Sequence, residues 1–176
     1  LNFEEDADYL LGFYKEQWVG QSIKHPNIMS IAKNVKGSVF LYHICEHIEG
    51  ITLRQWMQEN PNPDLQQAHN IFIRVVNAVR VLQRAGMVHR DLKPENIIIS
   101  DDNEVKLIDF GTVKISGFED IVKEQQDEPL GAVDYIAPEY LNHGQSSALS
   151  DLFSIAVMLY EVLTGHLPYP MNQGQS

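Results

Sequence analysis

The sequence predicts an α+β fold. Three segments carry apolar residues at helical spacing, and shorter runs typical of strands lie between them. The chain has 176 residues, 44% of them hydrophobic, which is enough apolar material for a sizeable core. No internal repeat or low-complexity linker interrupts it, so we expect no domain boundary inside these residues.

The first expected elements are a helix and a strand. Asn2 and Glu5 have the spacing of a capping box, and the helical pattern that follows covers residues 4–23. Residues 25–27, His-Pro-Asn, should end this helix because proline disfavours helical geometry in the residue before it. A strand is then predicted for residues 38–46, SVFLYHICE.

Two further helices are expected. One begins after Asp64, which has Gln67 three residues later as in a capping box. Its apolar stripe consists of Leu65, Ala68, Phe72, Val75, Val76, Val79 and Leu82. The other covers residues 151–165, is apolar nearly all round and ends at Gly165, so we expect a buried helix.

A tight hairpin is predicted between the last two of these helices. Strand-like runs at residues 96–100 and 104–109 flank the turn sequence Asp-Asp-Asn at residues 101–103. The residues just before the first strand should therefore lie next to those just after the second.

Polar side chains occupy these positions. Asp91 and Asn96 precede the first strand and Asp109 follows the second, so we expect all three in one cleft. Carboxylate and amide oxygens suit Mg²⁺, and Lys93 would add positive charge for a phosphate. The alternative is that each is an ordinary solvated loop residue, which fits any single member better than the set.

Composition narrows the classes of partner and compartment. The 13 Lys and Arg against 24 Asp and Glu give a net charge of −11, which argues against nucleic acid or an anionic membrane as a partner. Cys45 is the single cysteine, so an internal disulfide is excluded and a reducing compartment is favoured. The longest apolar stretch, LFSIAVMLY, is too short to span a bilayer, and we expect a cytoplasmic location.

Four motifs in order resemble those of protein kinases. Residues 89–96, HRDLKPEN, resemble the catalytic loop, and residues 109–111, DFG, the metal-binding motif. Residues 137–139, APE, and residues 151–154, DLFS, resemble the element that follows and the start of the buried central helix. Lys93 is typical of the serine/threonine branch. The stretch LGAVDYIAPEYL is similar to bacterial kinases, including those fused to a metal-dependent protein phosphatase.

The resemblance implies a two-lobe kinase fold that is truncated at both ends. Residues 1–47, approximately, would be the remainder of the small lobe, and residues 48–176 a mostly helical large lobe without its last helices. Glu16 would pair with the ATP-holding lysine, which with the glycine-rich loop would precede residue 1. We therefore expect these residues by themselves to be inactive and poorly stable.

The resemblance also implies roles in phosphoryl transfer from ATP to Ser or Thr hydroxyls of protein substrates. Asp91 would be the base, Lys93 would hold the γ-phosphate, and Asn96 and Asp109 would ligate Mg²⁺. Arg90 would normally pair with a phosphate on the activation loop. His89 would pack beneath Phe110.

Adenine recognition would fall on the segment after the predicted strand. By resemblance Cys45 is the gatekeeper, the carbonyl of Glu46 and the N–H of Ile48 meet the adenine edge, and Ile98 lies under the ring. The alternative is that Cys45, Ile48 and Ile98 are plain core residues.

Several residues depart from the family pattern. Residues 117–138 contain no Ser or Thr, so we hypothesise that Asp127 or Glu128 meets Arg90 in place of a phosphate; a solvated acidic loop is the alternative. Ala132 stands where many of these kinases have a Thr whose hydroxyl bridges the catalytic Asp and Lys. Gly20 stands where an apolar residue is usual, and we expect it to loosen the first helix.

Two rival functions remain. A pseudokinase would bind partners without transferring phosphate, but it has no need of a base and two metal ligands in one cleft. A phosphotransferase acting on a small molecule would share these residues, but the APE-like peptide-docking segment disfavours it. A phosphatase or other domain in the same protein is a further expectation from the resemblance.

Overall fold

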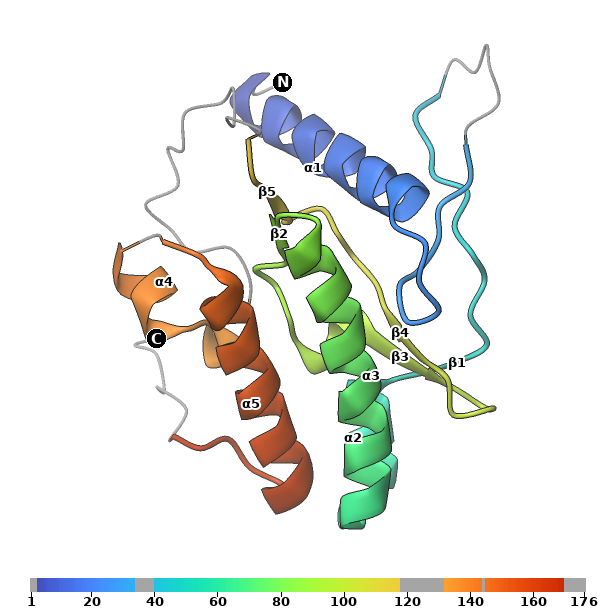
Figure 1. Ribbon diagram of the computed structural model, residues 1–176, viewed down its shortest axis with the longest axis vertical. Coiled ribbons are helices and arrows are strands. Elements are labelled where there is room, and N and C mark those ends of the chain that lie inside the picture. Colours follow the sequence, from blue (N-terminus) through green and yellow to red (C-terminus); the bar gives the residue numbers. More distant parts are fainter. Residues whose placement is uncertain (1–2, 34–39, 118–131, 144, 170–176) are drawn as a thin grey trace.

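The computed structural model describes residues 3–33, 40–117, 132–143 and 145–169 (Figure 1). The helices are α1 (Phe3–Ser22), α2 (Leu53–Glu59), α3 (Leu65–Arg84), α4 (Pro138–His143) and α5 (Ala148–Thr164), with 3₁₀ turns η1 (Pro94–Asn96) and η2 (Val133–Tyr135). The strands are β1 (Gly50–Thr52), β2 (Met87–Val88), β3 (Ile97–Ser100), β4 (Val105–Leu107) and β5 (Lys114–Ile115). The α+β prediction is confirmed.

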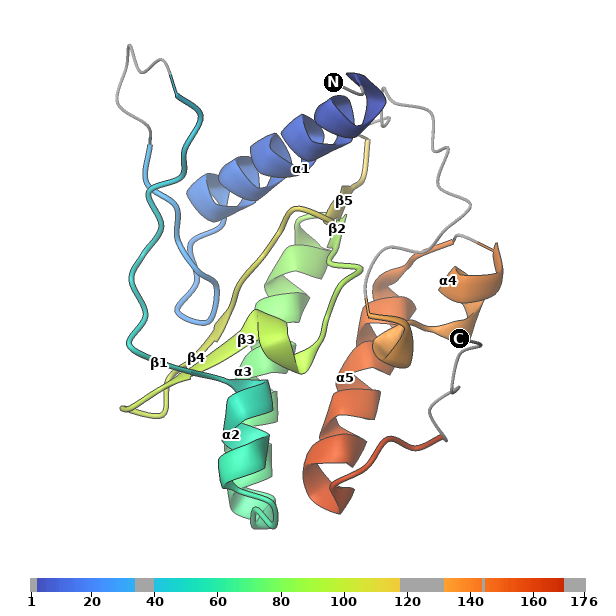
Figure 2. The ribbon, with the colours of Figure 1, turned by 180° about the vertical axis from the view of Figure 1, so that it is seen from behind.

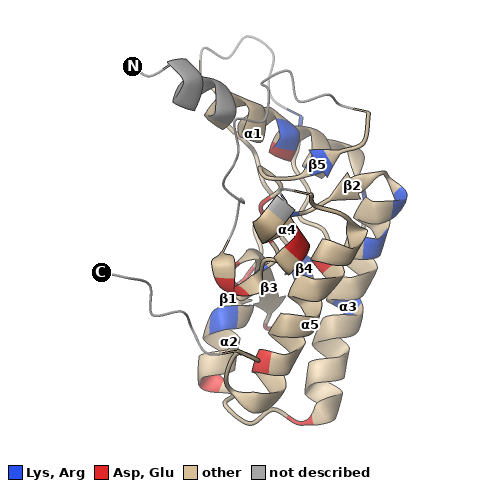
Figure 3. Ribbon diagram, turned by 90° about the vertical axis from the view of Figure 1, so that its left-hand side faces the viewer, with Lys and Arg blue, Asp and Glu red and all other residues tan. Residues whose placement is uncertain are grey.

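The long helices lie in two groups. Helices α3 and α5 pack side by side. Helix α1 lies apart from this pair, at the end of the molecule near β2 and β5 (Figures 1 and 2). Strands β1, β3 and β4 form an antiparallel sheet, and β2 pairs with β5. Basic and acidic residues are scattered among uncharged stretches on the face that Figure 3 shows. No helix in the described residues is long and apolar enough to cross a membrane.

Helix α3 begins as predicted. The Asp64 side chain accepts the Gln67 N–H at 2.7 Å, and the Gln67 side chain accepts the Asp64 N–H at 2.9 Å, a capping arrangement that contributes about 1 kcal/mol. The buried face consists of Ala68, Ile71, Phe72, Val75, Ala78, Val79 and Leu82. The prediction that Leu65 belongs to it is wrong: this side chain is 75% exposed because the first turn of α3 extends past the core.

Helix α5 starts three residues earlier than predicted. Ser147 caps it and exchanges hydrogen bonds with Ser150. Gly165 ends it at φ 77°, as predicted, because a left-handed residue there suits glycine. The prediction that the helix is buried nearly all round is wrong for the described structure. Leu149 and Leu152 are 70% and 53% exposed, while Ile155, Val157, Met158 and Val162 face the core.

The predicted hairpin is present. Ile97 pairs with Leu107 and Ile99 with Val105, and Asn103 takes φ 59° in the turn. The N–H of Ser100 donates to the Glu104 carbonyl at 2.9 Å. This register brings the start of β3 next to the end of β4.

The strand predicted for residues 38–46 is not found in its described part, residues 40–46. A single bridge joins Ile31 to Cys45, flanked by bonds from Ala32 N to the Ile44 carbonyl at 2.8 Å and from Glu46 N to the Ser30 carbonyl at 3.0 Å. The segment has β propensity but only this short pairing. Its apolar side chains gain little burial, since Phe40 is 82% exposed.

The loosening of α1 by Gly20 stays a prediction, and the structure adds a packing role for this residue. A Cβ at this position would lie 2.5 Å from Cγ1 of Ile31, so only glycine allows so close an approach. The N–H of Ile31 donates to the Gly20 carbonyl at 3.0 Å. Gly20 therefore fastens α1 to the segment that follows it.

Candidate active site

The loop after β2 is held by one buried carboxylate from α5. Asp151 is 1% exposed, and its two oxygens accept the N–H groups of His89 at 2.9 Å and Arg90 at 3.1 Å. Arg90 has φ 72°, a conformation that costs a non-glycine residue about 1–2 kcal/mol. Burial raises the pKa of Asp151, and His89 and the two N–H groups partly offset this. The bonds to Asp151 thus stabilise a strained turn directly before Asp91.

Both Asp91 oxygens have hydrogen-bond partners. Oδ2 accepts Lys93 Nζ at 2.7 Å and Asn96 Nδ2 at 3.0 Å, and Asn96 Nδ2 also reaches the Asp91 carbonyl at 2.9 Å. Oδ1 accepts the main-chain N–H of Ala132 at 3.3 Å. Asp91 is 7% exposed. The structure thus brings together Asp91, Lys93 and Asn96. The sequence analysis assigned the positive charge of Lys93 to a phosphate, and in the structure this charge also pairs with Asp91.

Asp109 lies at the end of the second hairpin strand. The Ile108 N–H donates to the Asn96 carbonyl at 3.0 Å, which joins the two strands of the hairpin at this end. Asp109 is exposed, takes φ 63°, and its Oδ1 is 3.4 Å from the Gly111 N–H. The predicted convergence of the Asp91 loop and Asp109 is therefore present along the backbone.

The oxygens of Asn96 and Asp109 fit Mg²⁺. Because Asn96 directs its amide nitrogen to Asp91, its amide oxygen is available to a cation, and Asp109 offers an exposed carboxylate. In the part of the chain that the structure describes, no three His, Cys, Asp or Glu side chains form a metal cluster. Mg²⁺ in proteins is bound by carboxylate and amide oxygens, and Asp109 and Asn96 carry donors of these kinds.

Phe110 and His89 form the buried support of this turn. Both are fully buried, and their rings meet edge to face at 5.8 Å between centroids, as predicted. Burial lowers the pKa of His89, although Asp151, Asp91 and Asp109 act in the opposite direction. His89 is therefore a packing residue whose burial favours the neutral ring.

Glu16 has a partner that the sequence analysis missed. His43 Nδ1 lies 3.5 Å from Glu16 Oε2, and the His43 ring stacks on Phe13 at 3.9 Å. Burial raises the pKa of Glu16, the nearby Asp109 charge raises it further, and His43 lowers it. The Glu16 carboxylate is thus near enough to Asp109 for the two charges to interact.

The proposed adenine segment is not plain core. Cys45 is exposed, and Ile48 and Ile98 are only partly buried. Burial and the Glu16 charge raise the pKa of the Cys45 thiol. The Glu46 side chain accepts bonds from Lys106 and from Ser30 N at 3.0 Å and Ser30 Oγ at 3.1 Å. The alternative that Cys45 is a buried core residue is excluded.

The regulatory predictions are tested only in part. Arg90 is buried, and its Nε donates to the Thr112 carbonyl at 2.6 Å. Asp127 and Glu128 lie outside the described residues. Their proposed contact with Arg90 stays a prediction.

A network around Arg54 was missed altogether. Arg54 Nε lies 2.8 Å from Glu95, its Nη1 lies 2.7 Å from Glu161, and its Nη2 bonds the Tyr135 hydroxyl. Tyr135 donates to Glu161 at 2.5 Å, and burial together with Glu161 raises its pKa. These side chains join α2, η1, η2 and α5. Arg54, Tyr135 and Glu161 also border a pocket of about 650 Å³. No local sequence pattern indicated this network, because Arg54 and Glu161 are 107 residues apart.

Comparisons with known proteins agree with this geometry. The model of the protein kinase domain matches residues 4–176. The chain is 30% identical to a probable serine/threonine-protein kinase PknB of Lactococcus lactis over 168 residues, and to serine/threonine-protein kinase PrkC of Bacillus subtilis over 169 residues. Each match covers 96% of this chain and 26% of the relative.

A third relative is serine/threonine-protein kinase PknL of Mycobacterium tuberculosis. It is 34% identical over 164 residues, which are 93% of this chain and 41% of that protein. The chain thus spans less than half the length of these relatives. The predicted resemblance to bacterial serine/threonine kinases is confirmed, and the match over residues 4–176 shows that the chain belongs to the protein kinase domain family.

Proposed function

We propose that the protein is a serine/threonine protein kinase that transfers the γ-phosphate of ATP to Ser or Thr hydroxyls of protein substrates. The observation that carries this proposal is the bonded set of Asp91, Lys93 and Asn96 at the end of a hairpin whose other strand leads to Asp109. Family membership supports it. The names of the bacterial relatives support the serine/threonine class.

The nucleotide would lie between two parts of the fold. We assign residues 1–47, approximately, to a small lobe and residues 48–176 to a large lobe. The position of α1 and the segment after it, apart from α3 and α5, supports this division (Figure 2). In this arrangement Cys45, the main chain of Glu46 and Ile48, and Ile98 would contact adenine.

Each residue of the bonded set has a separate task. Asp91 orients the substrate hydroxyl and accepts its proton. The Lys93 ammonium has three donors, of which one binds Asp91, so another can hold a γ-phosphate oxygen. Asn96 and Asp109 would hold Mg²⁺, which neutralises phosphate charge during in-line transfer. Glu16 would orient the lysine that holds the α- and β-phosphates.

The test is phosphate transfer from Mg-ATP to a basic protein substrate by the full-length protein. Asp91→Asn removes the base and keeps its shape, and we expect kcat to fall about 10²–10⁴-fold. The matched control is Asp101→Asn in the exposed hairpin turn, which should keep wild-type kcat. Absence of transfer from the unaltered protein favours the pseudokinase. Transfer to a metabolite pool but not to proteins favours the small-molecule phosphotransferase.

A further inference from the structure

The two oxygens of the Asp91 carboxylate are not equivalent. A carboxylate oxygen has two lone pairs, so it accepts about two good hydrogen bonds. Oδ2 already accepts two, from Lys93 at 2.7 Å and Asn96 at 3.0 Å. Oδ1 accepts one in the described structure, from the N–H of Ala132 at 3.3 Å. The free acceptor position of Asp91 is therefore on Oδ1.

We propose that Oδ1 of Asp91 receives the proton of the substrate hydroxyl, and that the main-chain N–H of Ala132 is the group that aims this oxygen. The inference rests on the proposed function and names the atom and the positioning group within it. The methyl side chain of Ala132 has no donor, so its N–H is the one group with which this residue can bond Asp91. Ala132 is a positioning residue, because it acts through Asp91.

The Ala132 amide is itself held in place from α5. The N–H of Tyr135 donates to the Ala132 carbonyl at 2.9 Å, which closes the η2 turn. The Tyr135 carbonyl accepts a hydrogen bond from Ser154 Oγ at 2.7 Å. The Tyr135 hydroxyl donates to Glu161 at 2.5 Å and accepts from Arg54. Tyr135 is 4% exposed. The donor that reaches Oδ1 is thus attached to the same helix whose Asp151 holds the other side of the Asp91 loop.

The proton balance of the step is complete with ATP as the phosphoryl donor. The substrate oxygen uses a lone pair to form a bond to the γ-phosphorus, while the bond from that phosphorus to the β,γ-bridging oxygen breaks. The electron pair of the broken bond leaves with ADP. The proton of the substrate hydroxyl moves to Oδ1 of Asp91, whose Oδ2 keeps its bonds to Lys93 and Asn96.

Proline at position 132 tests the inference directly. Ala132 has φ −75°, within the range of proline, so Ala132→Pro removes the N–H while keeping this backbone angle. We expect kcat to fall at least about 10-fold, because misplacing a reacting group is costly, with KM for ATP within about 2-fold. Ala132→Gly keeps the N–H and adds no side-chain donor, so it is the conservative replacement and should keep most of the rate, to within about 3-fold.

The outcomes separate this inference from the proposed function. An active protein in which Ala132→Pro keeps its kcat, or in which Ala132→Gly falls as far as Ala132→Pro, overturns the inference alone. No transfer by the unaltered protein overturns the proposed function and the inference with it. If Ala132→Pro loses its melting transition, semisynthesis that replaces the Ala132 N–H by an ester oxygen decides: a lower kcat supports the inference, and an unchanged kcat overturns it.

Discussion

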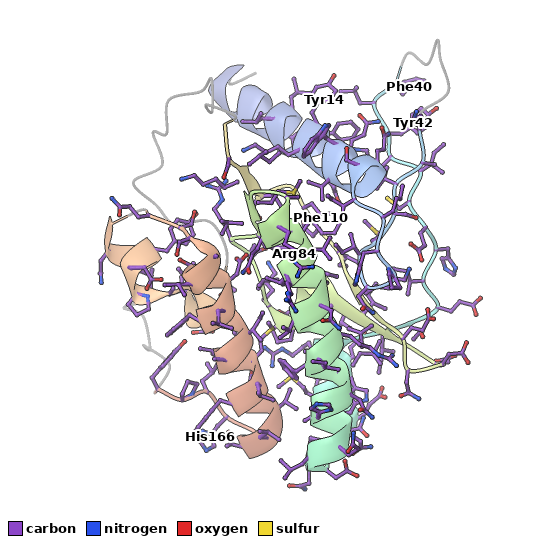
Figure 4. The ribbon with its side chains drawn as sticks, in the orientation of Figure 1. Tyr14, Phe40, Tyr42, Arg84, Phe110 and His166 are labelled. Carbon is purple, nitrogen blue, oxygen red and sulfur yellow. The ribbon has the colours of Figure 1, made fainter. Side chains whose placement is uncertain are left out.

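The Asp91 loop and the segment at residues 40–48 are held in different ways. Buried side chains and main-chain groups from distant elements hold the loop, among them Asp151, Asn96 and Ala132. The segment is held by the bridge from Ile31 to Cys45, by the Glu46 side chain and by the contacts of His43 with Glu16 and Phe13, and Phe40 within it is 82% exposed (Figure 4). The proposed base is thus held by buried groups, while the proposed adenine segment is held mainly by contacts with α1 and the residues just after it.

The largest effect on stability is expected for Asp151→Ala, which removes the carboxylate that holds the Asp91 loop. This change leaves the buried N–H groups of His89 and Arg90 without their acceptor, and we expect a loss of about 3 kcal/mol in stability. The melting temperature of the full-length protein measures it, with the exposed Asp102→Ala as control. A melting temperature equal to that of the control would mean that Asp151 does not hold the loop.

A smaller loss of stability is expected for Gly20→Ala, which acts on the segment at residues 40–48 through Ile31. Gly20→Ala places a Cβ 2.5 Å from Ile31, which pairs with Cys45, and α1 has to shift. Overpacking of this kind costs about 2 kcal/mol. Hydrogen exchange should speed up at the Ile31 amide, which bonds the Gly20 carbonyl, and should stay unchanged at the His89 amide. Faster exchange at both would show that the two regions are not independent.

The smallest expected effect is a pH dependence of the stability that Glu46 contributes in the segment at residues 40–48. Burial alone would raise the pKa of Glu46, but bonds from Lys106 and Ser30 and the Lys106 charge lower it below its ordinary value of 4.5. The folded pKa is thus below the unfolded one, so this stabilisation is complete above the unfolded pKa and is lost as the pH falls through the folded pKa.

Melting of the protein and of Glu46→Gln between pH 6 and pH 3 tests this pH dependence. The difference in melting temperature between them should shrink on acidification. A difference for Glu46→Gln that does not change with pH contradicts the assignment.

Features encoded by neighbouring residues could be predicted from the sequence. The cap of α3 needs only Asp64 and Gln67, and the end of α5 needs only Gly165. The 97–107 hairpin follows from its turn and apolar alternation, and it carries Asp91, Asn96 and Asp109 to one end. The central part of the candidate site was therefore predictable.

Features that depend on distant partners could not be predicted. Leu65 fits the helical stripe, yet it lies exposed at the start of α3, where the buried face begins only at Ala68. Residues 40–46 have strand propensity, but little pairing. Arg54 meets Glu161, which lies 107 residues later, and no local pattern indicates that contact. The Ala132 contact was hidden because a main-chain donor leaves no trace in residue type.

The bonds from Asp151 to the loop have a consequence for biosynthesis. Asp151 follows His89 by 62 residues, and ribosomes add about 5–20 residues per second, so the acceptor is made about 3 to 12 seconds after the donors. Until then the strained turn at Arg90 has no carboxylate to hold it. The nascent chain therefore contains α3 and the hairpin before it contains the acceptor of the Asp91 loop, which comes only with α5.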